Sequence, residues 1–345
     1  MRTKLAAAAA FLMLAAAAPA AAQSPPKPLF VADVPIHLTI TAPLGGLIRN
    51  RSASGAVPGT LVDSGGASLP IALSLRGITR RTKEVCEFPP LRVDFTAPPP
   101  AASAFAGQRR LKLVTHCRNS PGFQQYVLLE YAAYRMYNLL TPRSFRARLA
   151  NIDYRDSDGR PIASRVGFFI EDLDDVARRN GTREAHGPDR IPVSFLSAPD
   201  AARYTLFQHM IGNHDWSMRA GPAGEDCCHN AKLIGTLAPG ATIPVPYDFD
   251  FSGMVDAPYA TPPDVLHINN VRQRVFRGYC MHNPQTAAVA AEMRARRSAI
   301  LGVLGEVPGL DERSRAKAAS YLEGFFAEIG TDESLASRTL KRCIA

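Results

Sequence analysis

The hydrophobic pattern of this chain changes its period near residue 173, and this change limits the possible folds more than any other feature. Before that point, short segments alternate between apolar and polar residues, which is typical of strands with one buried face. The expected strands are 36–41, 69–77, 91–95 and 110–115, then a hairpin of 144–156 and 165–172. One helix, 123–140, interrupts them. Beyond residue 173 the sequence predicts helices at 198–212, 285–305 and 311–329, and short strands at 231–234 and 243–247.

This order predicts an α+β protein with a β-rich first lobe, about 35–172, and a helix-rich second lobe, about 173–345. The sequence has no internal repeats, so we expect the two lobes to form a single domain. Residues 42–67 are rich in Gly and Ser and are expected to form a loop. Residues 23–34 are rich in Pro and are expected to be a linker.

The N-terminus, residues 1–22, has the form of a secretory signal peptide. A positive segment precedes an apolar stretch, and Ala20-Ala21-Ala22 form a cleavage site. An uncleaved membrane anchor is the alternative, but Pro19 and the small residues favour cleavage. No later segment has the roughly 18–20 apolar residues that span a bilayer. We therefore expect a periplasmic or secreted protein without stable membrane insertion.

Basic residues outnumber acidic ones in this chain. The 40 Lys and Arg against 31 Asp and Glu give a net charge of +9, which falls to +7 once Arg2 and Lys4 leave with the signal peptide. The basic residues are spread thinly, in pairs and triplets, which suits an anionic ligand or a negative surface. One Trp and no nucleic-acid-binding signature argue against DNA or RNA as a partner.

The chain contains 6 cysteines. An even number in an oxidising compartment predicts disulfides, although the sequence does not choose among the possible pairings. Cys227 and Cys228 are adjacent, so we expect them to bond to different partners. A bond between Cys86 and Cys117 is expected in the first lobe, and Cys280 is expected to bond to Cys227 or Cys228.

The helix at 123–140 places a carboxylate among apolar residues. At 100° per residue, Glu130 falls inside the broad apolar face of this helix. A carboxylate that faces a core needs a cation or hydrogen bonds, because unpaired burial costs several kcal/mol. Lys112, on the preceding strand, could supply the cation, as a strand Lys and a helix Glu do in kinases. The plainer alternative is a solvated Lys and a Glu at the edge of the apolar face.

The segment 211–253 carries an ordered set of oxygen ligands: Asp215, Asn230, Asp248 and Asp250. Phosphoryl transfer needs a carboxylate that orients the attacking hydroxyl, and Asn and Asp ligands for a divalent ion. A helix cap at Asp215 and a strand-end turn at Asp248 are the structural alternatives. They account for each residue separately and not for the ordered set.

These stretches resemble the CotH spore-coat kinase family, a branch of the atypical protein-kinase-like folds. The matching segments are LRGITRRTKEVCEFPPLRVDF (75–95), RLKLVTHC (110–117), EYAAYRMYNLLTPRSFRARLANIDYRD (130–156), GFFIEDLDD (167–175), GNHDWS (212–217), CCHNAKL (227–233) and PYDFDFSG (246–253). The resemblance covers about half of the chain. It implies a two-lobed kinase-like fold that binds ATP with Mg²⁺ or Mn²⁺ and phosphorylates a protein or envelope acceptor.

The resemblance also implies roles for individual residues. Lys112 would bind phosphate and pair with Glu130, and Glu171 would lie near the interlobe hinge and the adenine pocket. Asp215 would be the catalytic carboxylate. The metal ligands would be Asn230 and Asp248, with Asp250 as a second candidate.

Three features depart from kinases in general. No GxGxxG motif precedes Lys112, and Arg76 with a neighbouring arginine pair takes its place, so an Arg contact to phosphate is expected. Asp215 and Asn230 are far apart in sequence, so the chain between them must fold back. A periplasm holds little ATP, which leaves open an unusual phosphate donor or a loss of catalysis.

Two other functions remain as alternatives. A kinase-like module of the cell envelope that binds nucleotide without transferring phosphate would keep the same residues. A zinc-dependent hydrolase would use a site built from His and Cys residues of the same segment: His209, His214, Asp215, Cys227, Cys228 and His229.

Overall fold

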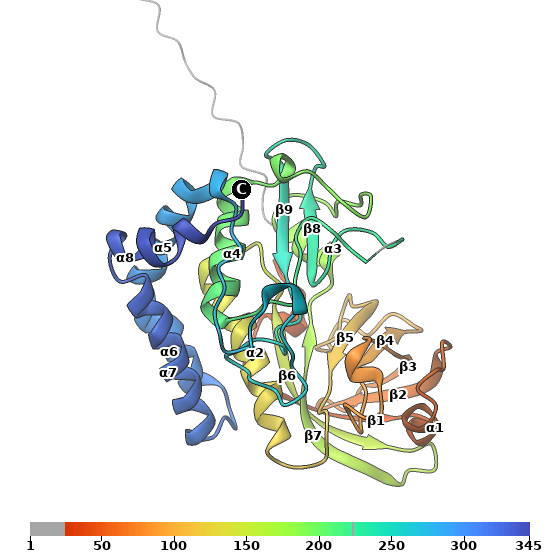
Figure 1. The fold of residues 1–345 in the computed structure, drawn as a ribbon. Helices are drawn as coiled ribbons and strands as arrows, with labels where there is room; N and C mark the ends of the chain where they lie inside the picture. Colours follow the sequence, from red (N-terminus) through yellow and green to blue (C-terminus); the bar gives the residue numbers. More distant parts are fainter. Residues whose placement is uncertain (1–24, 223) are drawn as a thin grey trace, which may run out of the picture.

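The computed structural model describes residues 25–222 and 224–345, and the first half of this range forms a closed sheet of seven strands (Figure 1). Its strands follow the order β1-β2-β3-β4-β5-β7-β6, and β6 returns to pair in parallel with β1. All the other neighbours are antiparallel. The strands are β1 (Ile36–Thr41), β2 (Val57–Asp63), β3 (Ser68–Leu75), β4 (Leu91–Phe95), β5 (Arg110–Val114), β6 (Ala147–Arg155) and β7 (Pro161–Ile170).

Alternation of apolar residues builds the interior of this closed sheet. In β1, Ile36, Leu38 and Ile40 are buried and the residues between them are more exposed, as the period of two requires. Phe105 and Phe169 meet edge to face in the same core. The predicted strands 36–41, 91–95 and 110–115 are therefore confirmed, with β5 one residue shorter than expected.

The segment 42–67, which we expected to be a loop from its Gly and Ser content, is a loop only in part. It forms the short helix α1 (Leu44–Arg49) and strand β2. Gly59 in β2 lies so close to β1 that an added Cβ would stand 2.7 Å from the carbonyl oxygen of Thr41. Gly59, one of the glycines that suggested a loop, is thus required for the close packing of β1 and β2.

The Pro-rich segment ahead of β1 packs against the folded body in part. Pro28–Phe30 form a 3₁₀ turn, and the side chains of Leu29 and Phe30 are buried in the core of the closed sheet. The predicted signal peptide lies outside the described residues.

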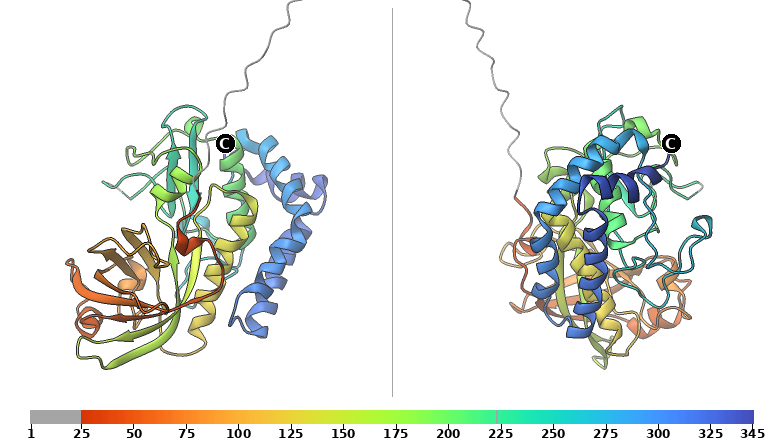
Figure 2. Two further views of the ribbon diagram at one scale, coloured as in Figure 1. Left: turned by 180° about the vertical axis from the view of Figure 1, so that it is seen from behind. Right: turned by 60° about the vertical axis from the view of Figure 1, so that its left-hand side comes forward.

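The second half of the chain is mostly helical, so the protein is α+β, with a β-rich N-terminal part and a helical later part. Figures 1 and 2 show α2 between the closed sheet and the C-terminal helices, and α4 between the β8–β9 hairpin and the C-terminal helices. The helices are α2 (Phe123–Leu140), α3 (Leu173–Arg179), α4 (Ala198–Ile211), α5 (Asn283–Ala295), α6 (Arg297–Glu306), α7 (Glu312–Glu328) and α8 (Asp332–Arg338). Strands β8 (Ala231–Gly235) and β9 (Thr242–Pro246) form a separate antiparallel hairpin. Short 3₁₀ turns lie at Thr79–Arg81, Val193–Phe195, Asp264–Leu266, Cys280–His282 and Leu340–Arg342.

The long helices of this half agree with the predicted ones, with one exception. The expected helix 285–305 is broken at Arg296 into α5 and α6. No Pro or Gly stands at the break, and both pieces bury apolar residues, among them Met293 and Ile300. Within the range that the structure covers, no helix is long and apolar enough to cross a membrane.

Three disulfides join all six cysteines, which is typical of proteins of oxidising compartments. The predicted bond between Cys86 and Cys117 is confirmed. The other two expectations are wrong, because Cys227 bonds to its neighbour Cys228 and Cys280 bonds to Cys343. Ile344 forms a parallel backbone bridge with Tyr279, and this bridge brings Cys343 to Cys280. Cys227 and Cys228 then bond to each other.

Candidate functional site

A cleft of about 740 Å³ opens between the closed sheet and the loops around the β8–β9 hairpin. One wall comes from the β3–β4 connection and from β5, and the other comes from the loops that flank the hairpin. Seven of the eight predicted site residues line this cleft: Arg76, Lys112, Glu171, Asp215, Asn230, Asp248 and Asp250. The eighth, Glu130, lies buried behind it.

The β8–β9 hairpin explains why Asn230 and Asp248 meet. The register pairs Ala231 at the start of β8 with Pro246 at the end of β9. The pairing continues one step further, since the backbone N–H of Tyr247 donates to the carbonyl of Asn230 at 3.3 Å. Asn230 and Asp248 therefore emerge at the same open end of the hairpin, although they are distant in sequence.

Gly212 sets the loop that carries Asp215. It ends α4 in the left-handed conformation, with φ of 65°, and an added Cβ would overlap the Tyr321 hydroxyl at 1.9 Å. The chain then turns sharply, and the Asn213 side chain accepts a hydrogen bond from the Asp215 backbone N–H at 3.1 Å. Trp216 anchors the same loop by donating from its indole nitrogen to the carbonyl of Asn213 at 2.9 Å.

The chain folds back after this loop and returns Asn230 to Asp215. A backbone bridge between Ser217 and His229 closes the excursion, with hydrogen bonds of 2.9 and 3.1 Å. The Asn230 side-chain amide donates to Asp215 Oδ2 at 2.9 Å and to the Asp215 carbonyl at 2.7 Å. The Asp215 Oδ1 atom lies 2.7 Å from His229 Nε2. This hydrogen bond raises the pKa of His229, against the opposing effect of burial.

Asn230 and Asp248 fit the ligand set of a hard divalent ion. The side-chain nitrogen of Asn230 donates to Asp215, so the side-chain oxygen of Asn230 remains available to another partner. The Asp248 carboxylate makes no hydrogen bond or ion pair to any described residue, and its backbone N–H donates to the Tyr134 hydroxyl at 2.9 Å. Both residues have left-handed backbones, with φ of 48° and 65°. Such conformations cost free energy and concentrate at functional sites.

Lys112 enters the cleft from β5 without a carboxylate partner among the described residues. Its ammonium lies 4.1 Å from the centre of the Tyr247 ring, a cation–π contact. Burial, together with the nearby charges of Arg76 and Lys232, lowers the pKa of Lys112 to about 7. The predicted ion pair between Lys112 and Glu130 is therefore not formed.

Arg80 takes the place of Lys112 as the cation beside Glu130. Its guanidinium lies 3.7 Å from Glu130 and 3.8 Å from Asp250, and it donates to the Thr115 carbonyl at 2.5 Å. Glu130 is buried, as its position on the apolar face predicted. The sequence did point to a basic segment here, since Arg80 belongs to the arginines that replace the glycine-rich motif. The direction of the Arg80 side chain, however, depends on the 3₁₀ turn Thr79–Arg81 and could not be predicted.

Asp250 belongs to this buried group more than to the open cleft. It accepts a hydrogen bond from the Tyr259 hydroxyl at 3.1 Å, in addition to its contact with Arg80. Burial, followed by the charge of Asp248, raises the pKa of Asp250 to about 7. Of the two aspartates in the Tyr-Asp-Phe-Asp sequence, Asp248 is thus the one with an open carboxylate.

Glu171 lines the cleft, but its carboxylate is already engaged. Both of its oxygens accept hydrogen bonds from Arg179, at 3.0 and 3.2 Å, and one also accepts from the Arg146 backbone at 3.0 Å. The side chain therefore ties the end of β7 to α3.

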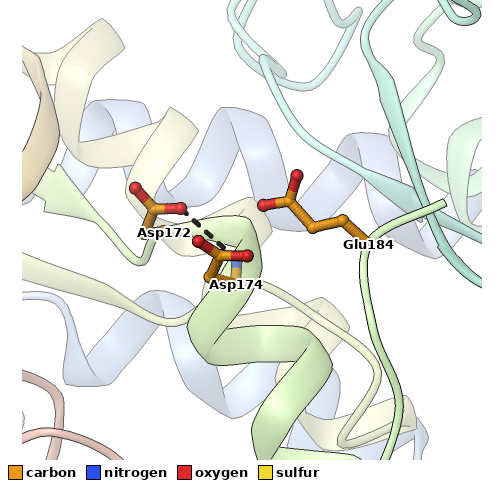
Figure 3. Close-up of side chains that lie close together, drawn as sticks. All are labelled: Asp172, Asp174 and Glu184. Carbon is orange, nitrogen blue, oxygen red and sulfur yellow. Dashed lines mark hydrogen bonds between the residues drawn. The ribbon is translucent and has the colours of Figure 1, made fainter. Parts of the chain in front are cut away.

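A second acidic group lies at the edge of the cleft and was not predicted. Asp172, Asp174 and Glu184 point toward one another, as Figure 3 shows. One carboxylate oxygen of each lies within 4.8 Å of one from each of the others. Asp172 caps α3, and it and Asp174 pair with Arg110 and Arg109. Their charges are thus partly compensated by the neighbouring arginines.

The zinc site proposed as an alternative is not assembled. Cys227 and Cys228 are oxidised to a disulfide and cannot act as thiolate ligands. His209 and His214 each face other partners, Glu328 at 2.9 Å and the Gln273 carbonyl at 2.8 Å. Of the proposed zinc set, Asp215 and His229 do meet, whereas His209 and His214 are directed to other partners.

Among described protein families and curated proteins, nothing matches this chain. Among solved structures, the chain is similar to the Golgi casein kinase with Mn/ADP bound. The identity is 10% and the TM-score is 0.34, over 92% of this chain and 77% of that chain. The chemistry of the cleft is therefore best judged from its own residues.

Proposed function

We propose that this protein is an exported, metal-dependent phosphotransferase that binds ATP in the cleft and phosphorylates a hydroxyl of a protein or envelope acceptor. One observation carries the proposal. Lys112 is a cationic side chain that has no carboxylate partner among the described residues. It faces a cleft that also holds the Asp215–Asn230 pair and the open carboxylate of Asp248.

The cleft offers an anionic ligand two kinds of surface. Arg76 and Lys112 present positive charge toward the space that Asp248 also lines, which suits a polyphosphate bound with a divalent ion. Val114, Phe145 and Leu233 add apolar surface to the lining of the same cleft, which suits a nucleobase.

Asn230 and Asp248 would hold the divalent ion, Mg²⁺ or Mn²⁺, through their free oxygens. Such an ion, when bound, neutralises charge on the transferring phosphate. Lys112 would bind phosphate oxygens by charge-assisted hydrogen bonds. Asp215, fixed by Asn213 and Asn230, would orient the attacking hydroxyl of the acceptor.

The remaining expectations belong to the same proposal. We infer a two-lobed kinase-like arrangement, with lobes of about 35–172 and 173–345 on either side of the cleft. The three disulfides support export and a periplasmic or secreted location. A nucleotide is the proposed anionic partner, since the basic residues line a cleft and the sequence has no nucleic-acid-binding signature.

The test is incubation of the mature protein with ATP and Mg²⁺ or Mn²⁺, with and without a periplasmic extract. Intact mass would report the addition of phosphate, and calorimetry would report metal-dependent ATP binding. We expect both in the wild type. The matched control is Lys341→Met, an exposed lysine outside the cleft, which should behave as wild type.

The two measurements separate the alternatives. ATP binding without phosphate transfer to any acceptor would favour the binding module of the cell envelope. Absence of metal-dependent ATP binding in a folded wild type would reject the proposed function.

A further inference from the structure

We propose that Lys232 is a second phosphate-binding lysine, which holds the triphosphate of the donor from the β8–β9 hairpin while Lys112 holds it from β5. This inference rests on the proposed phosphotransferase function and adds to it the way in which the donor is recognised. The donor is bound by its phosphate chain, between cations that belong to different elements of the cleft.

The two faces of the β8–β9 hairpin show where Lys232 is directed. Ile234 and Val245 belong to the large apolar core around α2 and α4, whereas Ala231 and Leu233 belong to a smaller core on the other side of the hairpin. Because side chains alternate along a strand, Lys232 shares the face of Ile234 and Val245. Lys232 is half-buried there, and it lines the cleft. A lysine thus occupies a position where the pattern of the strand would place an apolar residue.

Tyr247 connects Lys232 with Lys112. The register of the hairpin pairs Lys232 with Val245, and Tyr247 follows two residues later and packs against the same large core. Such diagonal neighbours lie about 7–8 Å apart, within reach of a long side chain. The ring of Tyr247 in turn lies 4.1 Å from the Lys112 ammonium. The two lysines therefore flank one aromatic ring, close to the open end of the hairpin where Asn230 emerges.

The cations around this part of the cleft have no compensating anion. Neither Lys232 nor the side chain of Arg76, which lines the same cleft, forms a hydrogen bond or an ion pair with any residue that the structure describes. Burial lowers the pKa of Lys112 most, and the charges of Arg76 and Lys232 lower it as well, against the opposing charges of Asp248 and Asp172. The three cations therefore repel one another, and an anion between them would relieve this repulsion.

A phosphate chain satisfies this arrangement better than a nucleobase does. Lysine binds phosphate as a point charge with three rotatable donors, so two lysines can hold oxygens of successive phosphate groups without a fixed geometry. A nucleobase is neutral and would leave the half-buried charge of Lys232 uncompensated, which is unfavourable. The phosphate chain alone should therefore be sufficient for binding in the presence of a divalent ion.

The decisive variant is Lys232→Met, studied by calorimetry in the presence of Mg²⁺ with two probes, ATP and inorganic tripolyphosphate. We expect the affinity for each probe to fall about tenfold, because the lost contact is to the part that the two share. Lys232→Arg keeps the charge and should lose less affinity than Lys232→Met. Lys341→Met, at an exposed position outside the cleft, is the matched control and should bind both probes as the wild type does.

The fold of the variant can be checked separately from binding. Methionine suits the apolar face that Lys232 shares with Ile234 and Val245, so the urea midpoint of Lys232→Met should not fall below that of the wild type. Should this variant fail to fold, Lys232→Gln removes the same charge and keeps a polar side chain, and the same loss of affinity is expected.

The possible results lead to different conclusions. Affinities of a folded Lys232→Met for ATP and tripolyphosphate within about twofold of the wild type would overturn the role of Lys232 and leave the proposed function intact. A loss confined to ATP would place Lys232 beside the nucleoside and would also overturn it, as would a wild type that binds ATP but not tripolyphosphate. Absence of metal-dependent ATP binding in the folded wild type would instead reject the proposed function.

Discussion

Two groups of charged residues lie in the cleft and directly behind it, and they differ in whether their charges are compensated. The inner group, Arg80, Glu130 and Asp250, is buried, and its cation lies within 4 Å of both carboxylates. The outer group, defined here as Lys112 and Asp248, contains a cation and an anion that pair with no described residue.

This difference separates structural charge from functional charge. A buried ion pair has lost its hydration and depends on its partner, so removal of one member is costly. An uncompensated charge at the edge of a cleft is also unfavourable in the free protein, but it is available to a ligand. We therefore expect variants of the inner group to affect stability and variants of the outer group to affect binding.

The largest expected effect is the loss of the inner cation. Arg80→Met leaves Glu130 and Asp250 buried together without a positive charge, and burial already raises the pKa of both. We expect the free energy of unfolding to fall by about 3–5 kcal/mol, which is typical of a broken buried pair. Urea denaturation at pH 7 would measure it. A loss below about 1 kcal/mol would contradict the structural role of the inner group.

Replacement of Asp248 should have the next largest effect, and it should act on binding. Asp248→Asn removes the charge that would attract a divalent ion, so the metal dependence of ATP affinity should weaken by about 10–100-fold. Asp215→Asn should keep metal-dependent ATP binding and lose phosphate transfer, since the carboxylate acts on the acceptor. Calorimetry with and without Mg²⁺, beside phosphate incorporation, distinguishes the two variants. Equal effects on both measurements would remove the separation of roles.

The inner group also shows what could be predicted from the sequence. The burial of Glu130 followed from its angular position on a helix whose limits, 123–140, agree with α2. Its partner did not follow, because the alternation of β5 gives the direction of Lys112 but not the distance to a neighbouring helix. The 3₁₀ turn that carries Arg80 into the core has no periodicity to read.

The oxygen ligands of the cleft could be predicted in membership but not in arrangement. Asp215, Asn230 and Asp248 were recognised from their order, and the fold places them in one cleft through the β8–β9 hairpin and the Ser217–His229 bridge. The contact between His229 and Asp215 was not foreseen. It depends on the return of the chain after an irregular loop, which local sequence patterns do not describe.

Replacement of the outer cation should have a smaller effect on ATP binding and none of the stability cost of Arg80→Met. Lys112→Met removes one charged donor to phosphate, so we expect ATP affinity to fall about tenfold. It also removes a half-buried ammonium that has no carboxylate partner in the described part of the chain, so the free energy of unfolding should stay the same or rise. Calorimetry and urea denaturation of the same preparation test both parts. A destabilisation as large as that of Arg80→Met would show that Lys112 has a structural charge.

The smallest expected effect is a proton taken up when ATP binds. Burial, with Arg76 and Lys232 nearby, lowers the pKa of Lys112 to about 7, so most of the protein holds this lysine neutral at pH 8. Phosphate oxygens favour the charged form and raise the pKa again. ATP binding at pH 8 should therefore take up a fraction of a proton, and ATP affinity should decrease as the pH rises above 7. Below pH 7 the lysine is already protonated, so the uptake should vanish. Calorimetry at pH 8 in buffers of different ionisation enthalpy measures the uptake, and Lys112→Met should abolish it. An uptake that persists in this variant would place the titrating group elsewhere in the cleft, and His229 would be the first residue to replace. It would also show that Lys112 is already charged before ATP binds.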